Sequence, residues 1–246
     1  MSSFKNRLII GRQPLVEAIE SGKTIDKILL QKNANGETAS IIKTLCKEHQ
    51  IPMQFVPVEK LNSFTKANHQ GVIAFAALVS YLPLQTIIDF TVEKGEAPLF
   101  LMLDGVTDVR NIGAIARTAL CCGAQAIIIA DKGVGALNEE TMKSSAGALE
   151  HIHICRVGSL MKAIDELHLN GIKVVASEMK AEKKLYDLEL KEPCCVVMGG
   201  EENGVYPAVM KICDEVFHIP MAGKFESLNV SVATGMILYE AMKQRC

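Results

Sequence analysis

Three stretches of the chain combine polar side chains with glycines directly after mostly apolar runs. They are residues 104–117, 199–204 and 220–229, and the preceding runs are residues 99–103, 194–198 and 216–219. In an open α/β sheet, ligands bind beyond the carboxyl ends of the parallel strands. We therefore expect these three stretches to meet at one edge of a sheet and to carry the chemistry.

The first stretch offers an amide and a guanidinium. Asn111 is a good N-cap for a helix over 112–122. Arg117 follows about one and a half turns later among small residues. An arginine placed there can grip a phosphate through two parallel N–H bonds. It can equally be a surface residue that pairs with Asp104 or Asp108. Spacing alone leaves both interpretations open.

The other two stretches can also be interpreted either as parts of a ligand site or as ordinary structural features. Glu201 and Glu202 lie among glycines, so the backbone can approach a ligand closely, although a turn with solvated acids gives the same pattern. Ser227 and Asn229 place a hydroxyl and an amide at the start of a helix, where capping is the ordinary explanation. The three stretches together predict a site more strongly than any one of them.

Other known chemistries find little support. Gly133 and Gly135 form half of a dinucleotide fingerprint, but Asn138 stands where the third glycine is needed. The sequence has no HExxH pair and no GxSxG elbow. The eight cysteines include no CxxC pair, and several lie in apolar runs. They are therefore interpreted as reduced core thiols of a cytoplasmic protein.

Apolar strands that alternate with helices predict an α/β fold with a parallel sheet covered on both faces. Expected strands of the C-terminal part are residues 99–103, 126–130, 172–176, 194–198 and 216–219, and expected helices are residues 112–122, 138–146, 159–170, 207–213 and 228–244. A smaller α/β unit precedes them. We predict domains at 1–78 and 99–246, joined by a linker over 79–98 that contains one short helix.

Composition and charge limit the class of protein. Apolar residues make up 49% and charged residues 22%, as in ordinary globular proteins. No apolar run is long enough to span a membrane, and the early Glu17 argues against a secretory signal. The formal charge is −2, but residues 1–66 hold ten Lys and Arg against six Asp and Glu. A basic N-terminal part can meet phosphates, although a solvated basic face is an equal explanation.

The segments NIGAIARTALCCGA, VMGGEENGV and IPMAGKFESLNVSVATGMILYEA resemble, in order and spacing, the three motifs of the SpoU/TrmH family of RNA ribose 2'-O-methyltransferases. GRQPLVEAI and HQGVIA resemble the small L30e-like substrate-binding domain of these enzymes, so the resemblance covers the whole chain. It is greatest for the branch that methylates a guanosine of 23S ribosomal RNA.

The resemblance implies a SPOUT fold with a deep trefoil knot, a homodimer, RNA as partner, and S-adenosyl-L-methionine (AdoMet) as methyl donor without a metal. It implies cofactor contacts, largely through the backbone, at Gly199, Gly200, Ile219, Met221 and Leu228. It also implies polar active-site positions at Asn111, Arg117, Glu201, Ser227 and Asn229.

The ribose hydroxyl is a poor nucleophile and must lose its proton as the methyl group transfers. The family resemblance implies that Arg117 takes this proton as the base, but a guanidinium normally stays protonated in proteins. We therefore expect Arg117 to anchor an RNA phosphate, while Ser227 and Asn229 orient the hydroxyl. We expect Glu201 to hold Arg117 or Asn111 in place. Glu202 and the pair 224–225 depart from the family pattern at the pocket mouth. A tRNA ribose methyltransferase and a non-catalytic RNA-binding protein are the alternatives.

Overall fold

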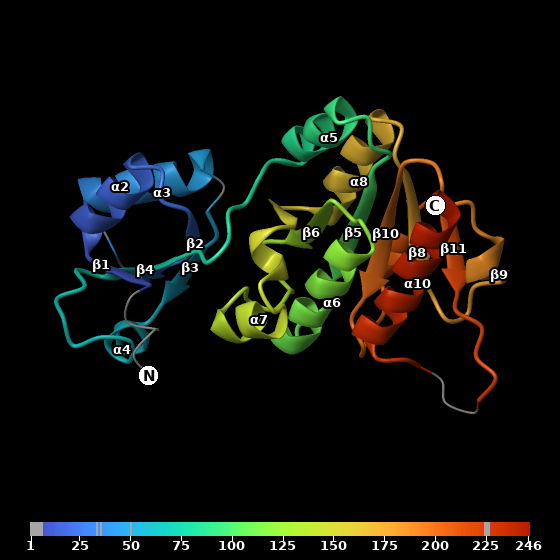
Figure 1. Cartoon of the computed structure of the whole chain (residues 1–246). Coiled ribbons are helices and arrows are strands. Elements are labelled where there is room, and N and C mark those ends of the chain that lie inside the picture. Colours follow the sequence, from blue (N-terminus) through green and yellow to red (C-terminus); the bar gives the residue numbers. More distant parts are fainter. Residues whose placement is uncertain (1–6, 33, 35, 50, 224–226) are drawn as a thin grey trace. The chain divides into compact units, whose positions relative to one another are not determined.

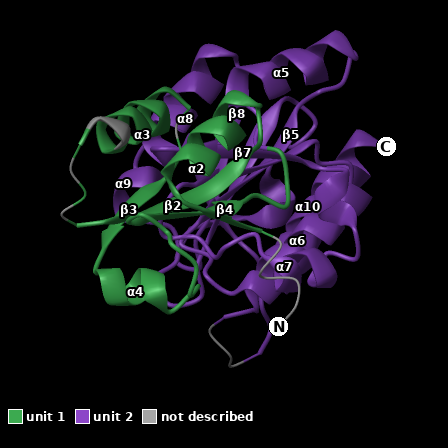
Figure 2. Ribbon diagram, turned by 90° about the vertical axis from the view of Figure 1, so that its left-hand side faces the viewer, with its two compact units in different colours: residues 1–80 green, residues 81–246 purple. Residues whose placement is uncertain are grey.

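The chain forms two compact units in the computed structural model, residues 1–80 and 81–246 (Figure 2). The structure describes residues 7–32, 34, 36–49, 51–223 and 227–246. The boundary differs from the predicted linker over 79–98. Helix α5 (Leu84–Glu93) buries Leu84, Ile87 and Ile88 in the core of the second unit, so it belongs to that unit. Burying this apolar side of the helix stabilises the unit by roughly 1.5–3 kcal/mol per side chain.

Unit 1 is a four-stranded sheet with helices. Its elements are β1 (Leu8–Ile10), α2 (Arg12–Glu20), β2 (Ile25–Gln31), α3 (Glu37–Glu48), β3 (Met53–Val56), α4 (Val58–Asn62) and β4 (Val72–Ala76). The strand order is β1-β4-β2-β3; β2 and β3 run parallel and the other pairs antiparallel. Helices α2 and α3 cover one face through a core that includes Leu15, Ile28 and Ile42. The predicted small α/β unit is confirmed in these described residues.

Unit 2 holds a seven-stranded sheet whose strands are all parallel. Its strands are β5 (Leu99–Asp104), β6 (Ala126–Ala130), β7 (His153–Val157), β8 (Lys173–Ser177), β9 (Lys183–Lys184), β10 (Cys194–Gly199) and β11 (Glu215–His218). The order is β7-β6-β5-β10-β8-β11-β9. Strand β5 is buried along Leu99–Leu103 because helices cover both faces of the sheet, which confirms the predicted fold class (Figure 1).

The helices form two layers. They are α6 (Val109–Cys121), α7 (Glu139–Ser144), α8 (Leu160–Leu169), α9 (Pro207–Met210) and α10 (Val230–Arg245), in addition to α5. Helices α5, α8 and α9 share one apolar core with the sheet. Helices α6 and α10 pack against one another on the other face, in front of the sheet in Figure 1. Gly113 allows α6 to press against α7, since a Cβ there would lie 1.9 Å from Ser144 Oγ.

Helix α6 begins earlier than predicted. Its N-cap is Asp108, whose Oδ1 accepts a bond of 2.8 Å from the backbone N–H of Arg110. Asn111 is therefore the third residue of the helix, and its expected capping role is wrong. An acidic side chain three residues upstream caps the helix instead, which leaves the Asn111 amide available for tertiary contacts. Helix α9 also ends at Met210, short of the predicted residue 213.

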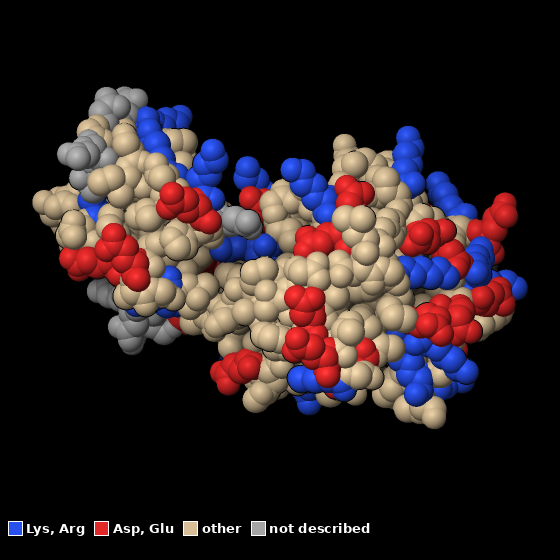
Figure 3. Space-filling model, turned by 90° about the horizontal axis from the view of Figure 1, so that it is seen from above, with Lys and Arg blue, Asp and Glu red and all other residues tan. Residues whose placement is uncertain are grey.

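Acidic and basic side chains of unit 2 are interspersed over the face seen in Figure 3. Within the described residues, no helix is long and apolar enough to cross a membrane. The trefoil knot is a property of the chain path that strand pairing does not decide, and it stays a prediction.

Candidate active site

Three side chains that are distant in sequence form one hydrogen-bonded network at the carboxyl edge of the parallel sheet. Asn111 lies in the first turn of α6, Glu201 follows β10 and Asn229 precedes α10. Asn111 Nδ2 donates to Glu201 Oε1 at 3.1 Å, and Asn229 Nδ2 donates to the same oxygen at 2.8 Å. Asn229 Nδ2 also donates to Asn111 Oδ1 at 3.1 Å. The sheet thus brings together one member of each predicted stretch.

Asn229 has two roles in this network. Its Oδ1 accepts from the backbone N–H of Ser231 at 2.9 Å, so it caps α10 as predicted. Because that oxygen is engaged in capping, the Nδ2 group points toward Glu201 and Asn111. Helix capping therefore orients the amide that joins the network, and one residue links the start of α10 to the end of β10.

Two glycines bring the Glu201 loop close to the neighbouring strand end. A Cβ on Gly199 would lie 2.0 Å from the carbonyl carbon of Gly204, and a Cβ on Gly200 would lie 2.3 Å from Gly105 O. Gly200 N donates to Asp104 O at 2.8 Å, and Asp104 Oδ2 accepts from the backbone N–H of Tyr206 at 2.7 Å. No side chain fits in either place, so the glycines let two backbone segments pack together, and their predicted close approach to a ligand stays a prediction.

A cavity of about 560 Å³ opens beside this network. Its walls include all five predicted cofactor contacts, namely Gly199, Gly200, Ile219, Met221 and Leu228, together with the predicted polar residues Glu201 and Ser227. The cavity lies past the ends of β8, β10 and β11, and its volume is in the range of small-molecule sites. The glycine backbone and apolar side chains of the wall fit AdoMet, whose adenine and amino-acid groups can bind main-chain amides.

Several further residues of this wall were missed by the sequence analysis, three of them polar residues at strand ends. Ser177 and Glu178 stand at the end of β8, and His218 stands at the end of β11. In open α/β sheets, ligands bind beyond the carboxyl ends of the parallel strands, so the end of the predicted strand 172–176 was the available signal. His218 Nδ1 is buried and has no hydrogen-bond partner among the described residues.

Arg117 lies apart from the network. It is exposed on α6 and makes no hydrogen bond or ion pair with any residue that the structure describes. Six helical positions separate it from Asn111, or about 240° around the helix axis. The surface ion pair left open above is absent, because Asp104 bonds Tyr206 and Asp108 contacts Arg110 Nε at 3.5 Å.

The remaining candidates of the sequence fall outside the network. Ser227 lines the cavity without a hydrogen bond to the described part of the chain, and Glu202 lines it too. Lys224-Phe225 lies outside the described residues. Of the Gly133/Gly135 pair, Gly135 has a packing role, because a Cβ there would lie 2.3 Å from Thr107 O, whereas nothing lies within 4 Å of a Cβ on Gly133.

The cysteines are free thiols. Burial raises the pKa of the Cys46 thiol to about 11, with a smaller opposing effect from a backbone hydrogen bond. Burial, followed by the charge of Glu166, raises the pKa of Cys155 to about 12. These thiols stay protonated near neutral pH and are poor nucleophiles.

Comparison with known proteins adds a family to this geometry. The model of the SpoU rRNA Methylase family matches residues 98–239. A model described as RNA 2'-O ribose methyltransferase substrate binding matches residues 8–82. A putative TrmH family tRNA/rRNA methyltransferase of Bacillus subtilis is 35% identical over 99% of this chain and 98% of its own length.

Two solved structures resemble the chain as well. An AdoMet-bound rRNA methyltransferase from Sinorhizobium meliloti has a TM-score of 0.61 at 23% identity and covers 96% of this chain and 87% of its own, a likeness of fold. The A. aeolicus TrmH/SpoU tRNA modifying enzyme has a TM-score of 0.54 at 30% identity, over 66% of this chain and 84% of its own. The chain belongs to the SpoU family of RNA ribose 2'-O-methyltransferases, whose methyl donor is AdoMet.

Proposed function

We propose that the protein methylates the ribose 2'-hydroxyl of a guanosine in 23S ribosomal RNA, in the cytoplasm and as a homodimer. The observation that carries the reaction is the Asn111–Glu201–Asn229 network beside the cofactor cavity. The choice of ribosomal RNA rests on the resemblance to that branch and on the substrate-binding unit. The tRNA modifying enzyme matches only 66% of this chain, whereas the Sinorhizobium rRNA methyltransferase matches 96%.

AdoMet supplies a methyl group on a sulfonium, which leaves as a neutral thioether. The protein must then place the ribose hydroxyl in line with that methyl group and ease the loss of its proton. Ser227 lies in the cavity wall with no hydrogen bond to a described residue, so its hydroxyl is free to meet the ribose. Glu201 acts as the positioning carboxylate, because its Oε1 already accepts from both amides. Pre-positioned dipoles of this kind need no reorganisation during the reaction.

An exposed apolar stripe on α10 supports the homodimer. Val232, Met236 and Tyr239 are 52%, 45% and 60% exposed, and their spacing of four and three residues places them on one side of the helix. Arg117 and Leu120 are three residues apart on the exposed side of α6, the helix that packs against α10. A two-fold interface on this layer covers the stripe on both copies.

This interface also gives Arg117 a place in the reaction. Within its own chain Arg117 is turned away from the network, but it belongs to the surface that a second copy covers. We therefore assign Arg117 to anchoring an RNA phosphate at the network of the partner subunit, where its positive charge lowers the cost of the developing alkoxide.

Methyl transfer from labelled AdoMet to 23S ribosomal RNA transcripts and to total tRNA tests the function. We expect label in one guanosine of the ribosomal transcript, located by mapping 2'-O-methylated positions. Label in tRNA alone would overturn the choice of substrate. AdoMet binding without label in any RNA, including ribosomal precursors, would overturn the enzymatic function.

Mixed dimers test the assignment of Arg117. Arg117→Ala and Asn229→Ala homodimers are each expected to lose at least about 100-fold in kcat. Co-expressed with two different tags and purified through both, the mixed dimer has one intact site and should recover up to half of the wild-type activity. Mixed dimers as inactive as the parents would show that both residues act from one chain.

A further inference from the structure

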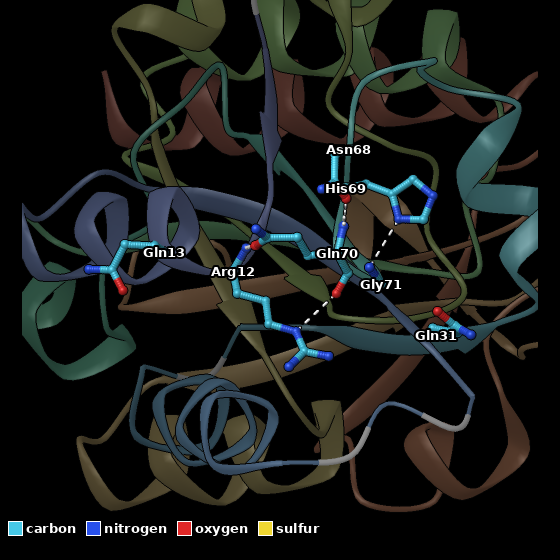
Figure 4. Close-up of a pocket in the computed structure, with 7 residues that line it drawn as sticks. All are labelled: Arg12, Gln13, Gln31, Asn68, His69, Gln70 and Gly71. Atoms are coloured by element: carbon cyan, nitrogen blue, oxygen red, sulfur yellow. Dashed lines mark hydrogen bonds between the residues drawn. The ribbon is translucent and has the colours of Figure 1, made fainter.

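Unit 1 contains a polar cavity of about 600 Å³ that lies entirely within that unit. It opens between the start of α2 and the turn that precedes β4 (Figure 4). Its walls are Arg12, Gln13, Gln31, Asn68, His69, Gln70 and Gly71. The family match assigns substrate binding to this part of the chain as a whole, without naming a group of the RNA or a residue that holds it.

The turn beside the cavity is held in an uncommon conformation. Gln70 has a φ of 50°, which is left-handed and unfavourable for a residue with a side chain. Its backbone N–H donates to Asn68 Oδ1 at 3.2 Å, and Gly71 N–H donates to His69 Nδ1 at 3.0 Å. Backbone strain of this kind persists where the surroundings enforce it, and it gathers at binding sites.

The His69 ring ties the turn to α4. Because Nδ1 accepts from Gly71, the ring hydrogen of the neutral imidazole is on Nε2, and it is donated to Asn62 Oδ1 at 2.9 Å. Both ring nitrogens are therefore engaged in holding the turn. His69 positions the turn and does not offer a nitrogen to a ligand.

Arg12 is held from the other side of the same turn. Its backbone N–H donates to Gln70 Oε1 at 3.0 Å, and its Nε donates to Gln70 O at 2.9 Å (Figure 4). These bonds fix the base of the guanidinium. Among the described residues, its two Nη groups have no acceptor and no carboxylate within 4 Å, and the Gln31 amide has no partner either.

A fixed guanidinium with both terminal nitrogens available is a binding group for an oxyanion. The start of α2 adds a partial positive charge, although its first amide, the Arg12 backbone N–H, already donates to Gln70 Oε1. No Phe, Tyr or Trp lines the cavity, and the one aromatic ring in its wall is the small His69 imidazole, which is engaged in holding the turn. The chemistry favours a phosphate over a nucleobase.

We propose that this cavity is a phosphate subsite, in which the Arg12 guanidinium binds one phosphodiester of the substrate RNA and the Gln31 amide lies beside it. The subsite rests on the proposed function for its ligand, which is RNA. It gives the N-terminal unit a defined RNA contact, in which Gln70 and His69 position the Arg12 guanidinium.

The test is the salt dependence of RNA binding by the full-length dimer. For Arg12→Gln, we expect affinity for the 23S ribosomal RNA substrate to fall about 10-fold at about 50 mM salt. The plot of log K against log salt should become shallower by about 0.7 to 0.9, the value for one phosphate contact. At saturating RNA, kcat should be unchanged. Arg12→Lys should recover the slope but only part of the affinity, because it keeps the charge and loses the fork.

Lys47→Gln is the matched control, since it removes one positive charge from an exposed position of α3 outside the cavity. Its salt slope should equal that of the wild type. If Arg12→Gln lowers the RNA affinity but leaves the slope of log K against log salt unchanged, Arg12 only stabilises the turn. This result would overturn the phosphate subsite. An unchanged affinity in a variant with wild-type Tm would overturn it as well. In both cases methylation by the wild type leaves the proposed function standing, whereas a wild type that methylates no RNA refutes that function separately.

Gln70→Gly tests positioning without removing the cation. The substitution relieves the left-handed strain and removes the acceptor for Arg12 N–H. We expect Tm to be equal or higher, affinity for RNA to fall about 3-fold, and the salt slope to remain that of the wild type. A wild-type affinity would show that the Gln70 side chain has no part in presenting Arg12, since the backbone acceptor of Arg12 Nε is kept in this variant.

Discussion

The two units contain polar clusters of opposite design. In unit 2 the cluster is centred on a carboxylate, and the Glu201 Oε1 atom accepts from two amides. In unit 1 the cluster is centred on a cation, and the bonds to Gln70 hold Arg12 while its terminal nitrogens find no described partner. In unit 2 the hydrogen bonds join the members of the cluster to one another, and they orient the amides of Asn111 and Asn229. The unit 1 cluster leaves its charge available, as a surface that grips an anion requires.

The clusters also differ in what surrounds them. The unit 2 network adjoins a cavity whose wall combines glycines and apolar side chains with charged ones such as Glu178, Lys180 and Glu202, a mixture that suits a whole cofactor. The unit 1 cavity is lined by polar residues and one charged one. We thus assign methyl transfer to unit 2 and the binding of an RNA phosphate to unit 1. Mutations should therefore be able to change kcat and RNA affinity separately.

The largest effect is expected from Gly199→Val. Its Cβ would lie 2.0 Å from the backbone of Gly204, where neither segment can yield. AdoMet binding, measured by calorimetry, should weaken by more than about 100-fold, with unfolding of unit 2 as the extreme case. Gly158→Ala is the control, because nothing lies within 4 Å of a Cβ there. Normal AdoMet affinity in Gly199→Val would remove the cavity from the proposed site.

Glu201→Gln separates chemistry from grip. A glutamine keeps one oxygen that can accept from Asn111 and Asn229, but it loses the negative charge. We expect kcat to fall about 100-fold while RNA affinity stays within about 2-fold of the wild type. Glu202→Gln, which alters the adjacent acid of the same cavity, should change kcat little. A loss of RNA affinity equal to the loss of kcat would show that Glu201 also binds RNA, and it would contradict the division of methyl transfer and RNA binding between the two units.

His69→Ala has the converse effect at smaller magnitude. It removes the acceptor of Gly71 N–H and the contact with Asn62, which costs about 1–2 kcal/mol of unit 1 stability. RNA affinity should fall a few-fold, and kcat at saturating RNA should not change. Chemical unfolding and RNA titration measure the two effects. His49→Ala, at the exposed end of α3, is the control.

The smallest expected effect is a loss of unit 2 stability at acidic pH. Burial would raise the pKa of Glu215, but its bonds to Lys173 and Lys183 outweigh burial and lower that pKa below its usual 4.5. A carboxyl with a lowered folded pKa stabilises the fold above its ordinary pKa, and the contribution is lost as pH falls through the lowered value. Unit 2 should therefore lose a few degrees of Tm below about pH 4.5. In Glu215→Gln this part of the loss should disappear, and an identical pH profile would contradict it.

Much of the fold was accessible from local patterns. Continuous apolar runs predicted the buried parallel strands, because strands covered on both faces need no polar alternation. The five residues that the motifs predict as cofactor contacts line one cavity, and their contact with the cofactor stays a prediction. The capping role of Asn229 was also predictable, since capping depends on the few residues at a helix start.

The tertiary structure decided which side chains meet. Asp108 took the capping position on α6, so Asn111 became available for Glu201, 90 residues away. The tertiary structure also turns Arg117 away from the network of its own chain. It places Arg12 against Gln70, which is 58 residues away in the sequence. Such contacts depend on where strand ends and turns lie in space, which no local spacing encodes. The sequence by itself determined which segments carry chemistry, and packing determined the partner of each side chain.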